Sequence, residues 1–558
     1  PVKAYIHFVG STEGIILFFR YLFVVFQSTI SAVIYWRLRK YGSSSILAAI
    51  IYCLHIPLTF MALSYNSMGL AFVGLTGLLM ATTNKFSKIT FYVIGLLTAC
   101  AVLCNPVFAL VYLLYSFCMI IYELTKNKKP RLFKFSEISF SIKTWFWITF
   151  GIFTITTMFF VFLFSRTNLK EILTNLPMLF TDPSYQFSSK DGGLKVFSTL
   201  SALLVLIKSS PYLFSANVIL TVAIAFDKKR TERRPLYLSA ASIIFVACIV
   251  QIILSPVLKE DFFFWMFPLA VFGFICFVLI RNKDKGIFIF LWVLGVLYAF
   301  CLDIASNFSP WSSTFGLAVS DMASVIFIKT IIDELRSQNE EKIKLNRNTN
   351  IGQKERNKLV KNRISKAVAI ILVSTLFFQI GLEFYIDADL NRYSQEYFFV
   401  SNWPSNDKLD TTVENGPLKG LKSTAYTVNL YNEMINDLDI IKEASKKQNG
   451  NTPVFISGYY PWAYLYLELP YATYGTGTDV YGYTSNNRLA KYYNLHPQKT
   501  PKYIYVPKMA KINIENMPQY MNKVFLPGDV KDIVAYVNKN YICSVLESDV
   551  GYIFKIMN

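Results

Sequence analysis

Charged residues are scarce in this chain of 558 residues. Asp, Glu, Lys and Arg together make up 16% of it, whereas soluble proteins average about 25%. Histidine occurs three times, at scattered positions that do not suggest a histidine-rich metal site. Of eight cysteines, seven lie inside apolar runs, and together they show neither a disulfide framework nor a zinc-binding spacing. These shortages argue against an ordinary soluble domain, a disulfide scaffold and a zinc-binding module.

Apolar residues occupy most of the chain instead. Hydrophobic types make up 53% of the sequence, and several runs reach the ~20 residues that cross the hydrocarbon core of a bilayer. Because such runs recur, the sequence predicts a polytopic membrane protein. We expect spans at residues 14–36, 44–64, 67–83, 87–104, 106–124, 144–165, 196–226, 236–256, 261–280, 286–304, 311–329 and 366–386.

The net charge of +19 is unevenly distributed between these spans. Lys and Arg are few in one set of loops and gather in the alternate set, 37–40, 84–88, 126–135, 227–234, 281–285 and 329–366. This asymmetry is the positive-inside signature, so we expect the basic loops in the cytoplasm. The basic excess then indicates contact with anionic membrane lipid, and no nucleic-acid partner is expected.

The same topology places both the first residues and everything after residue 386 outside the cell. A chain that begins outside the cell without a signal peptide is unusual. We therefore expect the sequence to be a fragment that lacks an N-terminal span and the external loop after it. A protein with a simple external N-terminus is the alternative.

The composition changes near residue 391, where charges of both signs and turn residues appear. We predict an all-α polytopic transmembrane domain of about twelve helices (residues 1–390, with a polar cytoplasmic loop at 333–365) followed by a small extracytoplasmic α/β domain, 391–558. Within this tail, a helical pattern at 431–448 precedes strand-like runs at 452–458, 501–507 and 541–556.

Ionisable side chains inside spans are costly, and three stand out. Arg20 lies near the external end of its span, while Lys208 and Asp321 lie near the middle of theirs. One interpretation is that Arg20 snorkels to the interface and that Lys208 and Asp321 neutralise each other. In the other, Arg20 and Lys208 bind a lipid phosphate in an outward-facing cavity. Alternatively, Pro211 breaks its run and leaves Lys208 at the surface.

Polar residues at the predicted external boundaries form a second group of candidates. A site that activates a sugar hydroxyl needs a carboxylate base, and a phosphate leaving group needs cations or a metal ion. No cofactor is assigned, although a divalent metal ion is one candidate. The Tyr65-Asn66 joint between two apolar runs either lines such a site or forms a plain turn. The acids that we expect at this face are Asp182, Asp191, Glu260, Asp261 and Asp303.

The order of these features resembles the GT-C superfamily of membrane glycosyltransferases, which use polyprenyl-phosphate-linked sugars. The resemblance covers most of residues 14–386 and is carried by "GIILFFRYLFVV", "LSYNSMGLAF" and "LTNLPMLFTDPSY". It implies that Tyr65 and Asn66 line a catalytic cleft at the outer face. It also implies a catalytic Asp in a first external loop, which would precede Pro1, so no catalytic base is assigned in this chain.

The resemblance implies a glycosyltransferase, of hexosyl or pentosyl type, in a bacterial cytoplasmic membrane. Its donor would be a polyprenyl-phosphate sugar, and its acceptor a cell-envelope glycan, lipid or protein. A transporter or flippase for lipid-linked glycans is the alternative, although the sequence shows no internal repeat. A third class, a membrane anchor that only presents the tail, is disfavoured by the number of spans.

Overall fold

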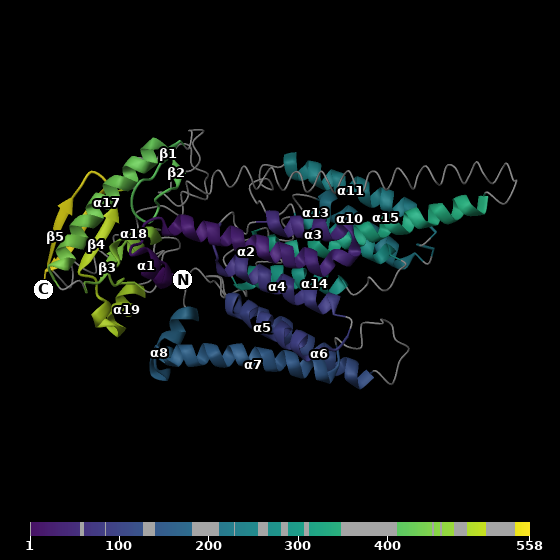
Figure 1. Ribbon diagram of the computed structural model, residues 1–558, viewed down its shortest axis with the longest axis horizontal. Helices are drawn as coiled ribbons and strands as arrows, with labels where there is room; N and C mark the ends of the chain where they lie inside the picture. Colours follow the sequence, from purple (N-terminus) through teal and green to yellow (C-terminus); the bar gives the residue numbers. More distant parts are fainter. Residues whose placement is uncertain are drawn as a thin grey trace. The chain divides into compact units, whose positions relative to one another are not determined.

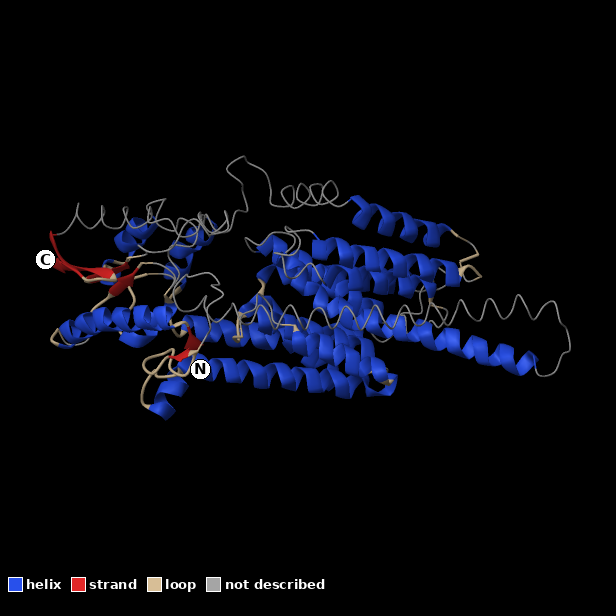
Figure 2. Cartoon of the chain, turned by 90° about the horizontal axis from the view of Figure 1, so that it is seen from above, coloured by secondary structure: helices blue, strands red, loops and turns tan. Residues whose placement is uncertain are grey.

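The computed structural model describes residues 2–55, 61–83, 85–125, 140–180, 211–227, 229–230, 232–254, 266–280, 288–305, 312–346, 410–448, 451–457, 460–473, 488–508 and 542–557. Within these ranges the chain is mostly helical, with a small sheet near the C-terminus (Figures 1 and 2). It divides into two compact units. We call Phe23–Pro177 with Phe187–Ala388 the membrane unit, and Pro1–Leu22 with Met178–Gln186 and Asp389–Asn558 the tail unit.

Long apolar helices make up the membrane unit, whose described residues also contain three short 3-10 turns, η1 (Arg39–Tyr41), η3 (Pro106–Phe108) and η6 (Ser312–Leu317). Four of the described helical stretches are long and apolar enough to cross a membrane, namely Ile15–Tyr41, Pro106–Leu124, Ile142–Phe164 and Thr314–Ser337. The helices are α2 (Ile15–Leu38, which begins in the tail unit), α3 (Ser43–Leu54), α4 (Tyr65–Thr82), α5 (Lys88–Cys104), α6 (Ala109–Thr125), α7 (Ile142–Phe164), α8 (Leu169–Phe180), α10 (Pro211–Phe226), α11 (Arg234–Leu254), α13 (Met266–Leu279), α14 (Ile289–Ala305) and α15 (Ala318–Asn346).

The membrane helices differ greatly in how far they are enclosed. In α15, 94% of the most apolar stretch is buried, whereas the corresponding value is 11% for both α6 and α7. The apolar part of α15 is therefore enclosed by other parts of the unit, while α6 and α7 lie at its edge (Figure 1). Two glycines allow α5 and α7 to approach closely, because a Cβ on Gly95 would lie 2.1 Å from the carbonyl oxygen of Ile148.

Two predicted segments differ from the observed helices. In the predicted span 44–64 the described helix is α3, which ends before the extended His55, while residues 56–60 lie outside the described residues and α4 begins at Tyr65. Helix α15 continues beyond the predicted span 311–329 to Asn346, into the predicted polar loop. Its last turns carry Glu, Lys and Leu, which favour helix and need no apolar surroundings to do so. The predicted span 366–386 lies outside the described residues.

The tail unit contains a four-stranded sheet in the order β3-β4-β6-β5. Strand β3 pairs with β4 in parallel, and the hairpin of β5 and β6 adds antiparallel neighbours. These strands confirm the predicted strand-like runs, and α17 confirms the predicted helix but begins six residues earlier, where Thr424 caps it. The elements are α1 (Val2–Val9), β1 (Thr411–Thr412), β2 (Lys422–Ser423), α17 (Ala425–Lys446), β3 (Val454–Ile456), α18 (Pro461–Leu467), α19 (Arg488–Leu495), η7 (Pro497–Lys499), β4 (Tyr503–Pro507), β5 (Ile542–Glu547) and β6 (Gly551–Met557).

The first residues of the chain pack within the tail unit. The amide of Gly14 donates to the carbonyl oxygen of Gly416 over 3.0 Å, and Lys419 pairs with Glu13 at 2.8 Å. Leu17, in the first turn of α2, packs against the apolar core beneath the sheet. The domain boundary near residue 390 stays a prediction, while residues 1–22 belong to the same compact unit as the tail.

Candidate functional site

The helix ends that border the predicted cytoplasmic loops lie together at one end of the membrane unit. Arg37 at the end of α2 donates two hydrogen bonds, of 3.2 and 2.8 Å, to the hydroxyl of Thr82 at the end of α4. Arg234 at the start of α11 forms a 2.5 Å ion pair with Glu334 near the end of the enclosed part of α15. We call this the basic end, because Lys and Arg are concentrated in the loops that adjoin it.

Helices α4 and α14 run antiparallel, and their register fixes what lies at the opposite end. A Cβ on Gly69 would meet the hydroxyl of Tyr298, and a Cβ on Gly77 would meet Leu291. Extending this register places Asn66 and Asp303 at about the same level along the two helices, at the end opposite the basic end. Both side chains are buried, with exposures of 4% and 2%. We call this the polar end of the unit.

Asn66 occupies this position because a helix starts there. The hydroxyl of Ser64 accepts from the amide of Ser67 at 3.3 Å, and the hydroxyl of Ser67 accepts from the amide of Ser64 at 3.0 Å. This reciprocal capping box begins α4 at Tyr65, so the Tyr-Asn joint is the first turn of a helix. Tyr65 is 57% exposed, whereas Asn66 is turned inward and buried.

Helices α2 and α3 add a polar connection. The side-chain amide of Gln27 on α2 donates to the carbonyl oxygens of Tyr52 and His55, at 2.6 and 2.8 Å. These contacts satisfy carbonyl groups that the end of α3 leaves without helical partners. The imidazole of His55 is 3% exposed and stacks on Phe315 of η6, with ring centroids 6.5 Å apart.

Tyr298 lies at the centre of the polar end. Its ring is fully buried and meets Phe108 edge-on at 5.8 Å. Tyr52, Tyr65, Cys104 and Cys301 lie within range of electrostatic interaction with it. Three buried atoms, the hydroxyls of Tyr52 and Tyr298 and the side-chain oxygen of Asn66, find no hydrogen-bond partner among the described residues. Such buried groups usually bind water or a ligand, so their grouping marks this end as a candidate site.

Asp321 lies apart from this group. Its neighbour Ser320 packs against Gly295, about eight residues along α14 from Asp303. At 1.5 Å per residue this corresponds to about 12 Å along the helix axis, towards the middle of the unit. The Asp321 side chain is fully buried there. The structure therefore separates Asp321 from Asn66 and Asp303.

The remaining predicted residues lie in the tail unit or outside the described residues. Arg20 belongs to the tail unit, where its side chain is 9% exposed. Asp182, Asp191, Lys208, Glu260 and Asp261 lie outside the described residues. Among the residues that the structure describes, no three His, Cys, Asp or Glu side chains gather as a metal site would require. The divalent metal ion therefore has no assigned ligands.

Several members of the polar end were not singled out from the sequence. Gln27, Tyr52 and Tyr298 are embedded in apolar runs, where an isolated polar residue does not reveal its depth or direction. Asn105 is also buried, and its side-chain oxygen accepts from the amide of Val107 at 3.1 Å. The Asn-Pro pair directly after a span was the one available signal, because it forces the chain to turn at that point.

No family model matches this chain, and no curated protein matches it. Two structures of an archaeal oligosaccharyltransferase from Archaeoglobus fulgidus are similar to it at low identity. One, AglB in complex with an inhibitory peptide and a dolichol-phosphate, is 11% identical with a TM-score of 0.37. The other, tethered to an acceptor peptide, is 12% identical with a TM-score of 0.33.

The matches cover 97% and 96% of this chain but only 63% and 62% of the oligosaccharyltransferase chains, so this chain spans less than two thirds of their length. At TM-scores this low, neither neighbour establishes the fold of this chain.

Proposed function

We propose that this protein is a membrane glycosyltransferase that moves a sugar from a polyprenyl-phosphate carrier to a cell-envelope acceptor. The observation that carries the proposal is the buried polar end, where Asn66, Tyr298 and Asp303 are all buried near the ends of α4 and α14 that lie opposite the basic end. Burying polar groups inside a membrane unit is costly, and such groups are retained mainly where they bind a polar ligand. The GT-C resemblance of the sequence supplies the reaction class.

The reaction needs a short list of chemical groups. An acceptor hydroxyl or amide attacks the anomeric carbon, the bond from that carbon to the phosphate oxygen breaks, and the lipid phosphate leaves with the bonding electrons. A carboxylate takes the acceptor proton, and donors or cations stabilise the leaving phosphate. We propose that the carboxylate of Asp303 interacts with the acceptor. Asn66 and Tyr298 would form hydrogen bonds with the bound sugar or phosphate. The sequence-based prediction that Arg20 binds the lipid phosphate stays a separate proposal, because Arg20 belongs to the tail unit.

The basic end supports a particular orientation of the protein across the membrane. Positive residues favour the cytoplasmic side, so the polar end would face the outside in a bacterial cytoplasmic membrane. There it would meet envelope acceptors and a donor sugar displayed on its lipid. The tail, which follows a predicted last span, would then be extracytoplasmic.

A transporter or flippase for lipid-linked glycans is the second candidate. Asp321 favours it, because its carboxyl group is fully buried near the middle of the unit. Ionisable residues at that depth are typical of proton or substrate pathways. A transferase has no need of a carboxyl group about 12 Å from its reaction centre.

The test is an assay of the full-length protein in proteoliposomes that contain a radiolabelled polyprenyl-phosphate sugar and envelope acceptors. The proposal expects label to move to an acceptor, and Asp303→Asn to reduce that rate by about a hundredfold while the protein remains folded. Asp333→Asn, at the basic end and 45% exposed, is the matched control and should leave the rate unchanged. Translocation of the intact donor without transfer would overturn the proposal in favour of the flippase.

A further inference from the structure

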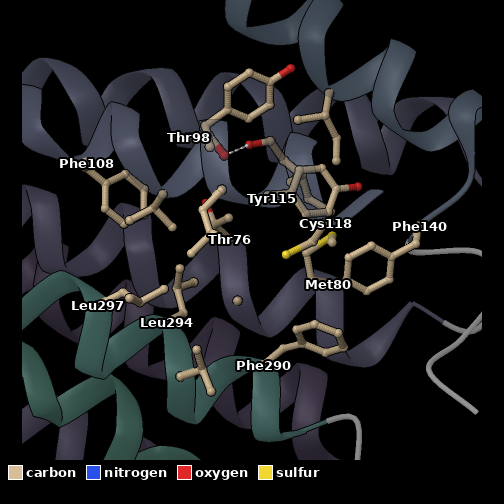
Figure 3. Close-up of a pocket in the computed structure, with 17 residues that line it drawn as sticks. Thr76, Met80, Thr98, Phe108, Tyr115, Cys118, Phe140, Phe290, Leu294 and Leu297 are labelled. Carbon is tan, nitrogen blue, oxygen red and sulfur yellow. Dashed lines mark hydrogen bonds between the residues drawn. The ribbon is translucent and has the colours of Figure 1, made fainter. Parts of the chain in front are cut away.

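A second feature of the membrane unit is an apolar cavity of about 180 Å³, bounded by α4, α5, α6, α7 and α14 (Figure 3). Phe108 and Leu297 line it towards the polar end, and Phe140 and Phe290 line it towards the basic end. Cys118 and Met80 also lie on its wall. The cavity is therefore distinct from the group of Asn66, Tyr298 and Asp303.

The cavity has an enclosed side and a side that faces the lipid. Ile94 on α5 and Ile148 on α7 line it and are 2% and 3% exposed. Leu114 and Cys118 on α6 also line it but are exposed, with Leu114 at 47%. Because α6 lies at the edge of the unit, this exposure is towards the bilayer. The cavity can thus be entered sideways by a hydrocarbon chain.

The lining excludes water as the natural occupant. An apolar cavity of about 150 Å³ stays dry and accepts a hydrocarbon as large as benzene. If nothing fills it, the lining side chains lose dispersion contacts on one side. In Figure 3 the hydroxyl of Thr98 is directed to its own helix, where it donates to the carbonyl oxygen of Ile94 at 2.8 Å. A hydrocarbon segment therefore complements these walls.

Charge at the basic end indicates the headgroup. Lys88 and Lys143 begin α5 and α7, the two helices that flank the cavity there, and both are exposed. The ammonium of Lys88 lies over the ring of Trp147 at 5.7 Å, and Trp favours the headgroup region of a bilayer. Lys85 is also exposed nearby. These three lysines compare with one acidic residue on α6, Glu123. This excess of positive charge matches an anionic headgroup.

We propose that this cavity holds part of an acyl chain of an anionic phospholipid, with the headgroup at Lys88 and Lys143. The occupant comes from the bilayer itself, whose lipids surround α6 at high local concentration. This site does not depend on the proposed glycosyl transfer, and its occupant need not be consumed by any reaction.

The test uses the full-length protein in nanodiscs that contain phosphatidylglycerol with a diazirine in the acyl chain. After photolysis, mass spectrometry of the peptides should locate adducts on α5, α6 and α14. Cys118→Trp fills the cavity from the lipid side and should reduce these adducts by about tenfold, because losing two buried methylene groups already costs that much. Phe117→Trp is the matched control, since Phe117 is 60% exposed and does not line the cavity.

Two further arms keep the test decisive. Thr98→Leu fills the cavity from the enclosed side and loses only a hydrogen bond within its own helix. It should reduce the adducts by the same factor, and it remains a usable test if Cys118→Trp fails to fold. Replacing Lys88 and Lys143 with Gln should abolish the preference for phosphatidylglycerol over phosphatidylcholine. Equal labelling of wild type and Thr98→Leu would overturn the proposal. Labelling of these helices by a diazirine polyprenyl phosphate alone would also overturn it.

Discussion

Gly69 on α4 lies directly against the hydroxyl of Tyr298 on α14, where a Cβ would come within 2.3 Å of that oxygen. This contact brings the two helices together at the polar end, close to the helix ends that carry Asn66 and Asp303. It joins residues 229 positions apart, and neither residue attracts notice in the sequence.

Gly69→Ala should therefore disturb the polar end. The new methyl group pushes against Tyr298 and, at 3.2 Å, against Cys104, and such overpacking typically costs about 1–3 kcal/mol. Thermal unfolding in detergent should show a lower midpoint, and transfer activity should fall with it. Gly74→Ala is the control on the same helix, because its Cβ would meet the flexible end of Met322 at 3.3 Å and lie in ordinary contact with Val319 at 3.7 Å. Adding Tyr298→Phe to Gly69→Ala should restore part of the stability.

Arg20→Ala should weaken binding of the lipid-phosphate sugar. Removing one charged partner of a partly desolvated contact costs about 1.5–3 kcal/mol, or roughly ten- to a hundredfold in affinity. Arg20→Lys should recover part of the affinity, because a point charge still meets phosphate but lacks the planar fork. Direct binding measured with fluorescent donor would check this, with the exposed Arg39→Ala as control. Unchanged affinity would leave Arg20 as a snorkelling residue.

The predicted topology can be tested by cysteine labelling in intact cells. In a cysteine-free background, Lys447→Cys in the tail should react with a membrane-impermeant maleimide, whereas Lys229→Cys should react only after the cells are opened. Both positions are exposed on the protein, so access across the membrane decides the result. Labelling of Lys229→Cys from outside would contradict the assignment of the basic end to the cytoplasm.

A buried network in the tail gives a stability prediction. Asp437 on α17 accepts from the hydroxyls of Tyr505 at 3.0 Å and Ser548 at 2.6 Å. Tyr505→Phe removes one donor from a carboxylate that is 4% exposed and should cost about 1–3 kcal/mol in urea unfolding. Tyr426→Phe, at a tyrosine that is 53% exposed, should have little effect. If Tyr505→Phe costs no more stability than Tyr426→Phe, water replaces the lost hydroxyl at the Asp437 carboxylate.

The same tyrosine predicts a dependence on pH. Burial, and then the neighbouring Asp437 carboxylate, raise the pKa of Tyr505 in the folded protein. A raised pKa means that folding favours the protonated phenol. The stability that the phenol contributes is therefore fully present below the pKa of tyrosine in the unfolded chain, about 10, and is lost progressively as the pH rises above it. Wild type should therefore lose stability above about pH 10 more steeply than Tyr505→Phe. Parallel profiles would exclude this linkage.

The tail was predictable from its sequence to a large extent. Its strands are short runs rich in Val, Ile, Tyr and Phe, and turn residues separate them, so β3, β4 and the β5-β6 hairpin fall where the pattern places them. The start of α17 was missed, because its first turns carry Tyr, Thr and Val, and the capping hydroxyl of Thr424 decides the boundary. The packing of Leu17 against this core joins distant parts of the chain, which local patterns do not reveal.

For the candidate site, the sequence identified residue types but not their grouping. Asn66 and Asp303 are polar residues at the ends of apolar runs, and that alone made them candidates. Asp321 is predicted near the middle of its span instead, and the contact of its neighbour Ser320 with Gly295 agrees with that depth. Gln27, His55 and Tyr298 became visible only through hydrogen bonds and ring contacts between helices. The register between two helices depends on which small residues meet, so the periodicity within one helix does not predict it.

The sequence by itself indicated apolar helices suited to a membrane and predicted basic loops on one side of it, because transfer of apolar and charged groups depends on composition. The tertiary structure decided which helix is central. The apolar stretches of α6 and α15 are both suited to a bilayer, yet 11% of one and 94% of the other is buried. Lipid tails are as apolar as a protein interior, so hydrophobicity does not distinguish the two environments. Close packing at small residues such as Gly295 and Ser320 places α15 inside.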